Sequence, residues 1–260
     1  MARPQLRSPG NALLALAGAA AVGVTSVLTV FGVKTLNAEA ALLAGDVGWI
    51  MGGTGLPDPT VGDYISQVES LYLQPFSAYS FQGLETPEEF CPPVCFPGPP
   101  DHPEWTNLNF GDSLNVGVQQ LDGAIRTPLA DGTNVAVLGY SQSATLATQE
   151  MNDLIANAGT SGYPTVDQLA NLHVVLLGDP NNPIGGILDR FQFPDGVQAF
   201  SLSPEAQHLP FLNVPLGIAP TPTDTMPTDI YTGEYDGYAN FPQDPTNILA
   251  DINALVGIET

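Results

Sequence analysis

Basic residues are scarce in this 260-residue chain, and their scarcity limits what the chain can bind. Lysine and arginine together number 5 against 27 aspartate and glutamate residues, which gives a formal net charge of −22 at pH 7. Beyond residue 40 the only lysine or arginine side chains are Arg126 and Arg190. Such a surface cannot neutralise a phosphate backbone, so nucleic acid is excluded as a partner. Anionic lipid headgroups would also repel it, so any attachment to a membrane must be hydrophobic.

Charge of either sign is missing from residues 12–33, a run of 22 positions. Two arginines precede this run, and the small-x-small sequence Ala38–Ala40 follows it. A basic region, an apolar region and a small-residue site in this order are typical of an export signal, although the run is also long enough to span a bilayer. We expect residues 1–40 to be a cleaved signal peptide or a retained membrane anchor, with a buried core helix as the alternative. Residues 41–260 then form an extracytoplasmic domain that is secreted or anchored to the cell envelope.

Cysteine is limited to Cys91 and Cys95, which are separated by Pro-Pro-Val. An oxidising compartment favours a disulfide between them, and the small loop that it closes implies a modest stabilisation. A metal site would need more ligands than this stretch offers, so we expect no metal. No cofactor motif is present either, since the glycines at 52–55 match neither of the common phosphate-binding patterns.

A strand, a sharp turn and a helix are predicted between residues 133 and 151. Asn134–Leu138 is a continuous apolar run, and helix-favouring residues follow from Ala144. Between them lies Gly139-Tyr-Ser141-Gln-Ser143, which has the form of a nucleophile elbow with a serine at the tip of a tight strand-to-helix turn. The usual pattern ends in glycine, and Ser143 is small enough for the same packing. The alternative is a plain loop serine after a strand.

Apolar runs and helix-spaced segments alternate along the rest of the chain. Strands are predicted at 46–51, 134–138, 172–178 and 228–234, and helices at 60–73, at 113–125, from 144 onward and at 247–258. This alternation indicates an α/β fold with a mostly parallel sheet and helices on both faces. Ligands of such sheets lie at the carboxyl ends of the strands, where the sequence places Met51, Ser141, Asp179 and Asp236.

Three loops are candidates for a role at the site. The glycine-rich loop 52–55 could bring backbone N–H groups and the Thr54 hydroxyl to a substrate oxygen, or it could be an ordinary turn. The excursion 181–227 is interpreted as a cap over the active site that presents apolar surface to a lipid, with an irregular surface loop as the alternative. The excursion 74–110 holds the cysteines, and loops of this length are usually functional or disordered.

A serine nucleophile needs a base, usually histidine, that a carboxylate orients. Asp179 and Asp236 are the acid candidates because both follow predicted strands. The only histidines are His102 among prolines, His173 at the start of a strand, and His208 in the predicted cap. None follows Asp236, although the usual chain order in α/β-hydrolases is serine, acid and then histidine.

Several segments from about residue 46 onward form a specific set. They are Met51–Pro59, Leu73–Pro75, Thr86–Phe90, Gly139–Ala144, Gly178–Asn181 with Gly185-Gly186, Tyr235–Gly237, Phe241-Pro242, Asn247 and Asn253-Ala254. Taken together, they make the chain resemble the PE-PPE domain of mycobacterial cell-envelope serine hydrolases, which are similar to cutinases. The resemblance implies a cutinase-like α/β-hydrolase fold with Ser141 as the nucleophile, Asp236 as the acid, and Thr54 and the Gln142 backbone N–H as oxyanion donors. An apolar segment directly before such a domain also resembles the membrane-associated trehalose-lipid acyltransferases.

The chain departs from this family pattern at two places. Asn240 stands where the family usually has aspartate, and the family histidine comes shortly after the closing helix, beyond Thr260. We therefore expect a C-terminally truncated domain, with an inactive form or recruitment of His208 as the alternatives. The expected activity is hydrolysis of apolar acyl esters through an acyl-enzyme. Acyl transfer between trehalose lipids, and non-catalytic binding of a lipid or a partner, remain open.

Overall fold

A computed structural model describes residues 45–190, 208–209, 214–215, 219–242, 244 and 247–258. All of them belong to the second of the chain's two units, residues 45–260. The predicted signal or anchor, residues 12–33, lies outside the described part. Within the described part, no helix is both long and apolar enough to cross a membrane.

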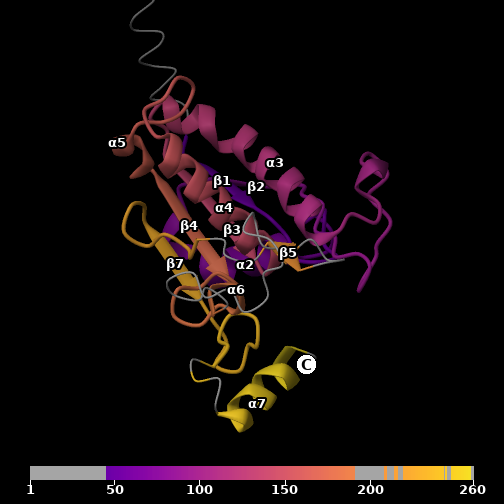
Figure 1. Cartoon of the computed structure of the whole chain (residues 1–260). Helices are drawn as coiled ribbons and strands as arrows, with labels where there is room; N and C mark the ends of the chain where they lie inside the picture. The colour runs from indigo at the N-terminus through magenta and orange to yellow at the C-terminus, as the bar shows by residue number, and fades with distance from the viewer. Residues whose placement is uncertain are drawn as a thin grey trace, which may run out of the picture. The chain divides into compact units, whose positions relative to one another are not determined.

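Five parallel strands form the central sheet (Figure 1), and the alternating pattern had predicted a mostly parallel sheet. Their order across the sheet is β2-β1-β3-β4-β7. The strands are β1 (Val47–Ile50), β2 (Ser80–Gly83), β3 (Val135–Tyr140), β4 (Leu172–Leu177) and β7 (Thr228–Tyr231). Because every pair is parallel, the carboxyl ends of all five strands lie at the same end of the sheet.

Helices cover both faces of this sheet. On one face α3 (Phe110–Ala130) and α4 (Gln142–Asn157) lie side by side and share an apolar cluster with the sheet (Figure 1). On the other face α2 (Tyr64–Tyr72) and the following 3-10 turn η1 (Gln74–Phe76) pack on a second cluster. The fold is therefore an α/β-hydrolase-type three-layer arrangement, in which each sheet face is shielded from water.

The packing of the central strand β3 on both faces explains the unbroken apolar run in its sequence. Val135 and Val137 belong to the cluster under α3 and α4, whereas Ala136 and Leu138 belong to the cluster under α2. Successive side chains of a strand point to opposite faces, so a strand covered on both sides needs apolar residues at every position.

Several boundaries differ from the sequence prediction. β2 was not expected, because Ser80–Gly83 is an edge strand with alternating exposure and little apolar character. Helix α3 starts at Phe110 instead of residue 113, because Asn109 caps it by accepting the Asp112 N–H at 2.9 Å. Helix α2 starts only at Tyr64, four residues later than expected.

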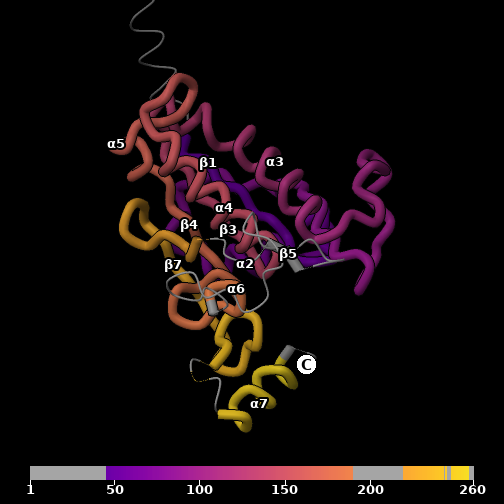
Figure 2. The backbone as a smooth tube through the Cα atoms, in the orientation of Figure 1, coloured from indigo at the N-terminus to yellow at the C-terminus, as the bar shows by residue number. Residues whose placement is uncertain are grey.

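The remaining elements are short, apart from the closing helix. They are η2 (Pro103–Trp105), α5 (Val166–Leu169), α6 (Ile187–Arg190), β5 (His208–Leu209), β6 (Val214–Pro215) and α7 (Ile248–Ile258). The chain between β2 and α3 makes a long excursion that can be followed in Figure 2. Most of the predicted cap, including residues 191–207, lies outside the described part.

Candidate active site

Ser141 lies at the junction of β3 and α4, where the sequence predicted an elbow. Its backbone has φ +56° and ψ −110°, a conformation that non-glycine residues rarely adopt. Its N–H donates to the Leu177 carbonyl at 2.9 Å, which fastens the turn to the neighbouring strand β4. Such strain is retained at functional sites when the surrounding structure enforces it. Here the buried strand before Ser141 and the buried helix after it do so.

The small residues around the elbow are required by close packing. A Cβ atom on Gly139 would lie 2.7 Å from the Ser143 backbone oxygen, so any side chain there would push strand and helix apart. Ser143 is fully buried, and its hydroxyl accepts the Tyr140 N–H at 2.8 Å and donates to the Tyr140 carbonyl at 3.2 Å. The serine that replaces the usual glycine therefore stabilises the turn.

The glycine loop after β1 lies directly against the elbow. A Cβ atom on Gly53 would be 2.8 Å from the Tyr140 ring and 3.1 Å from the Tyr140 carbonyl oxygen. Next to it, the Thr54 hydroxyl donates to the Gln142 Oε1 at 2.8 Å. The two residues named as oxyanion donors thus contact each other, although they are separated by 88 positions in the chain.

Backbone N–H groups at these two residues are available for a ligand. Gln142 is the first residue of α4, and the first N–H groups of a helix have no acceptor within the helix. Among the described residues, neither the Gln142 N–H nor the Thr54 N–H has a hydrogen-bond acceptor. Because the Thr54 hydroxyl hydrogen is directed at Gln142, the backbone N–H is the donor that Thr54 can offer to a substrate oxygen in this arrangement.

Asp236 lies in a loop after β7, beside the end of β4. Its Oδ1 accepts the N–H groups of Tyr238 at 2.9 Å and Ala239 at 3.1 Å. Its Oδ2 approaches Gly178, where a Cβ atom would lie 3.0 Å from that oxygen. One carboxylate oxygen is thus fixed by backbone donors, and the other is left beside the strand ends, where an imidazole N–H could bind.

The loop that carries Asp236 is held closed by its own residues. Asn240, where the resemblance led us to expect aspartate, donates its side-chain amide to the Glu234 carbonyl at 2.7 Å. Its backbone N–H donates to the Asp236 carbonyl at 2.7 Å. The asparagine therefore has a structural use at this position.

Asp179, the other acid candidate, is built into the interior. It is fully buried, and its Oδ2 accepts the Thr221 hydroxyl at 2.6 Å while its Oδ1 accepts the Asn181 N–H at 2.9 Å. Burial raises the pKa of Asp179 to about 6. Since both oxygens have internal partners, this carboxylate holds the loop after β4 and is poorly placed to orient a histidine.

The two histidines with described side chains bind other carboxylates. His173 is the second residue of β4, and its Nε2 lies 2.8 Å from the Asp229 Oδ2, toward the amino ends of the strands. His102 stacks on Trp105 with ring centroids 3.8 Å apart, and its Nδ1 lies 3.0 Å from Glu104. The side chain of His208 lies outside the described part.

A cavity of about 310 Å³ lies elsewhere, between the end of α2 and the start of β2. Its wall includes Phe76, Tyr79 and Phe81. Phe76 also contacts His173, which lies near the amino end of β4. The cavity therefore lies at the amino ends of the strands, opposite the end that carries Ser141. It is not part of the elbow site.

Comparison with known proteins identifies the family to which the chain belongs. The model of the PE-PPE domain matches residues 77–260. The chain belongs to the PE-PPE domain family. This match includes the elbow, the Asp236 loop and the segment Thr86–Phe90, whereas the glycine loop lies before it.

Named relatives of this PE-PPE chain include enzymes. This chain is 42% identical over 210 residues to "Esterase PE16" of Mycobacterium tuberculosis strain H37Rv, and the aligned region covers 80% of this chain and 34% of that protein. It is 26% identical over 212 residues to "Diacyltrehalose acyltransferase Chp2" of the same strain, covering 80% and 53%. The chain thus spans about a third to a half of the length of these relatives. Among solved structures, the catalytic core domain of acetyl xylan esterase from Trichoderma reesei matches with a TM-score of 0.42 and 16% identity, covering 82% of this chain and 92% of that one.

Two further residues, which the sequence analysis did not single out, contact the elbow. The Gln142 side-chain amide donates to the Ser113 hydroxyl at 2.8 Å and to the Glu89 carbonyl at 3.0 Å. Ser113 was the first residue of the helix predicted at 113–125, and no local sequence pattern indicated a role for its hydroxyl at the site. Glu89 lies in one of the segments that carry the family resemblance, which was the available signal.

Proposed function

We propose that this protein is an exported serine esterase that hydrolyses apolar acyl esters through an acyl-enzyme on Ser141. The observation that carries the proposal is the strained elbow itself. Ser141 directly precedes Gln142, and the Gln142 side chain contacts Thr54. The backbone N–H groups of Thr54 and Gln142 have no acceptor in the described part of the chain, which supports the proposal. A nucleophile next to preorganised backbone donors is the arrangement that acyl transfer requires.

In the proposed reaction the Ser141 hydroxyl attacks the ester carbonyl while its proton passes to a histidine. The carbonyl oxygen becomes an oxyanion, which the Thr54 and Gln142 N–H groups stabilise by about 3 to 4 kcal/mol per donor in comparable sites. Collapse of the intermediate releases the alcohol, which takes the proton from the histidine. Water then attacks the acyl-enzyme by the same steps and releases the carboxylic acid. Asp236 orients the histidine through its Oδ2.

The identity of that histidine is the open element of the triad. His102 and His173 are engaged with Glu104 and Asp229, which argues against both. His208, in the predicted cap, is the remaining histidine of the printed sequence. It is the base candidate that a substitution can test in this chain.

Acyl transfer is the second candidate, and the similarity to a protein named as a diacyltrehalose acyltransferase favours it. The acyl-enzyme is common to both reactions, and only the acceptor differs: water gives an esterase, whereas a sugar hydroxyl gives a transferase. In either case the proposed substrate is an acyl ester of a lipid, and we propose an extracytoplasmic location in which the protein is either secreted or anchored to a membrane through residues 12–33. A non-catalytic lipid-binding protein would have no turnover at all.

The test is hydrolysis of 4-nitrophenyl butyrate and laurate by the protein as its gene encodes it. We expect turnover that Ser141→Ala abolishes, with the laurate ester preferred. An acyl-trehalose donor incubated with and without free trehalose separates the two enzyme classes, because a transferase forms new acyl-trehalose. His208→Ala tests the cap histidine as base. Absence of turnover with every ester would leave only the binding protein.

A further inference from the structure

The segment Thr86–Glu89 carries more buried polar groups than its position in a loop would suggest. Thr86, Glu88 and Glu89 are exposed by 0%, 1% and 2%, although glutamate is rarely buried without a partner. It belongs to the segments that identify the family, yet none of its side chains has a part in the proposed chemistry. Its contacts lead to the glycine loop 52–55, which is the oxyanion loop of the proposed site because it carries Thr54.

Backbone hydrogen bonds join this segment to the loop that carries Thr54. The Gly55 N–H donates to the Glu88 carbonyl at 2.8 Å, and the Thr86 N–H donates to the Pro57 carbonyl at 3.2 Å. Glu88 itself has φ +50°, a second strained non-glycine residue close to the site. The strained backbone directs the Glu88 carbonyl toward Gly55, the residue directly after Thr54.

The Gln142 side chain joins the segment to the elbow. Its Nε2 has two hydrogens, and the Glu89 carbonyl and the Ser113 hydroxyl accept them at 3.0 and 2.8 Å. The Ser113 hydroxyl also accepts the Glu89 N–H at 3.0 Å. Because a carbonyl can only accept, the amide nitrogen must face Glu89, and the Oε1 must face Thr54. The orientation of Gln142 therefore fixes where the Thr54 hydroxyl is held.

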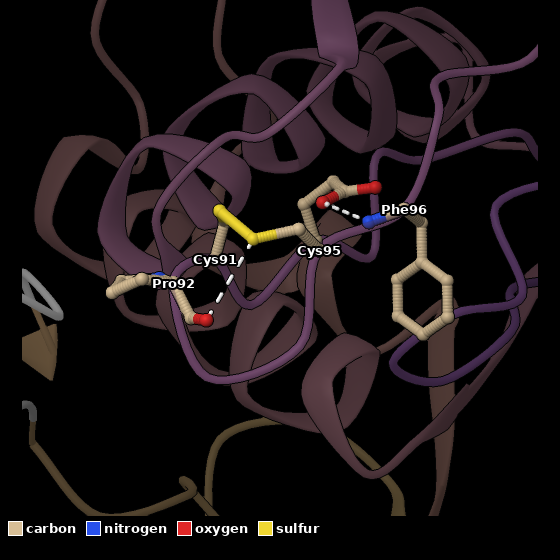
Figure 3. The surroundings of a disulfide bond; sticks show 5 residues. Cys91, Pro92, Cys95 and Phe96 are labelled. Carbon is tan, nitrogen blue, oxygen red and sulfur yellow. Dashed lines mark hydrogen bonds between the residues drawn. A yellow bond between two sulfur atoms is a disulfide. The ribbon is translucent and has the colours of Figure 1, made fainter.

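A third contact comes from Phe96, which lies seven residues beyond Glu89. Phe96 follows the disulfide of Cys91 and Cys95, and its N–H donates to the Glu89 Oε2 at 3.2 Å (Figure 3). A Cβ atom on Gly55 would lie 2.6 Å from the tip of the Phe96 ring. The ring thus covers the oxyanion loop from outside.

We propose that Ser113 is a positioning residue for the oxyanion loop, acting through the Gln142 side chain and the segment Thr86–Phe96. Ser113 does not touch the substrate. Its hydroxyl holds Gln142 and Glu89 in the geometry that keeps the Thr54 and Gln142 N–H groups convergent. This inference rests on the proposed function only where it concerns turnover, because the placement of the loop can be measured without catalysis.

Ser113→Ala removes the shared acceptor, and Thr145→Val is the matched control. Thr145 is also fully buried, but its hydroxyl has no hydrogen-bond partner in the described part of the chain. We expect Ser113→Ala to lower kcat for ester hydrolysis by roughly 10- to 100-fold with KM changed less than twofold. Loss of oxyanion stabilisation weakens transition-state binding alone and so leaves KM unaffected. Thr145→Val should stay within twofold of the wild type in both constants.

Amide hydrogen exchange of the peptide covering residues 52–57 provides the second readout. We expect exchange there to be at least tenfold faster in Ser113→Ala, and unchanged in the control, while peptides from β3 and β4 keep their protection. Ser113→Thr retains the hydroxyl and should restore the slow exchange. If the wild type has no turnover but the exchange result holds, the proposed function fails and the positioning role stands. Equal exchange at 52–57 in Ser113→Ala and Thr145→Val would overturn the inference.

Discussion

Glu150 gives the protein a stability that falls as pH rises, and Glu150→Gln should reduce that fall. The side chain lies on α4 and is 1% exposed, and neither carboxylate oxygen has a hydrogen-bond partner in the described part of the chain. Burial raises its pKa from the ordinary 4.5 to about 8, and repulsion by Asp122 and Asp153 adds to this effect, while Arg126 opposes it. At neutral pH the native protein therefore keeps a proton on Glu150 that the unfolded chain has lost.

The magnitude follows from this difference in bound protons. Between pH 4.5 and 8 the native state holds about one more proton than the unfolded state, so the free energy of unfolding falls by about 1.4 kcal/mol per pH unit. From pH 5 to pH 8 the loss from Glu150 is roughly 3 to 4 kcal/mol. Burial also raises the pKa of Glu88 to about 8, so this second carboxyl group contributes a similar slope. Glu150→Gln removes the contribution of Glu150 to the pH dependence of the unfolding free energy and should leave that of Glu88.

Urea unfolding at pH 5, 6, 7 and 8 measures this effect. The wild type should lose stability steeply across the series, and Glu150→Gln should lose about half as much. The absolute stability at pH 5 is not the readout, because a buried glutamine amide also lacks partners. Glu69→Gln on α2, which is partly exposed, is the matched control and should leave the slope unchanged. A slope for Glu150→Gln equal to that of the wild type would refute the reasoning.

Two pairs of substitutions test the proposed role of Asp236 and the close packing at the elbow. Asp236→Asn should lower kcat of ester hydrolysis by up to about 10⁴-fold with little change in Tm, because an asparagine favours the wrong histidine tautomer. Asp179→Asn should instead lower Tm, since that carboxylate holds Thr221 and Asn181; the opposite pattern in steady-state kinetics and thermal melts would exchange the two roles. Gly139→Ala should cost about 1 to 3 kcal/mol in urea unfolding, because its Cβ would meet the Ser143 backbone at 2.7 Å. Gly123→Ala on α3, with no atom within 4 Å of the added carbon, should be neutral or stabilising, and equal costs for the two would contradict the packing argument.

The layers of the fold were visible in the sequence where burial was uniform. β3 and β4 are covered on both faces, so their runs are almost entirely apolar, with His173 near the start of β4 as the exception, and they were recognisable as strands. β2 escaped notice because Ser80–Gly83 lies at the edge of the sheet and has only partial cover. The early start of α3 depends on a cap at Asn109, whose side chain accepts the Asp112 N–H, whereas the apolar spacing in the sequence placed the start of this helix at residue 113.

The site was predictable as far as it depends on strand ends. Ser141 and the Thr54 loop follow strands directly, so a parallel sheet brings them to one edge. The support beneath them was not predictable, because it depends on contacts across long stretches of chain. Ser113 is separated by 29 positions from Gln142 and by 24 from Glu89. No local pattern marks a serine whose hydroxyl completes such a network.

Fluorophosphonate labelling read by intact mass tests the central claim most directly. The protein as its gene encodes it, its Ser141→Ala variant and its Ser143→Ala variant are incubated with the reagent and compared. We predict a single adduct on the wild type and on Ser143→Ala, and none on Ser141→Ala, because Ser141 is the proposed nucleophile and directly precedes the proposed oxyanion donor Gln142. An adduct that persists in Ser141→Ala, or a wild type that takes up no reagent, would contradict the assignment of Ser141 as the nucleophile.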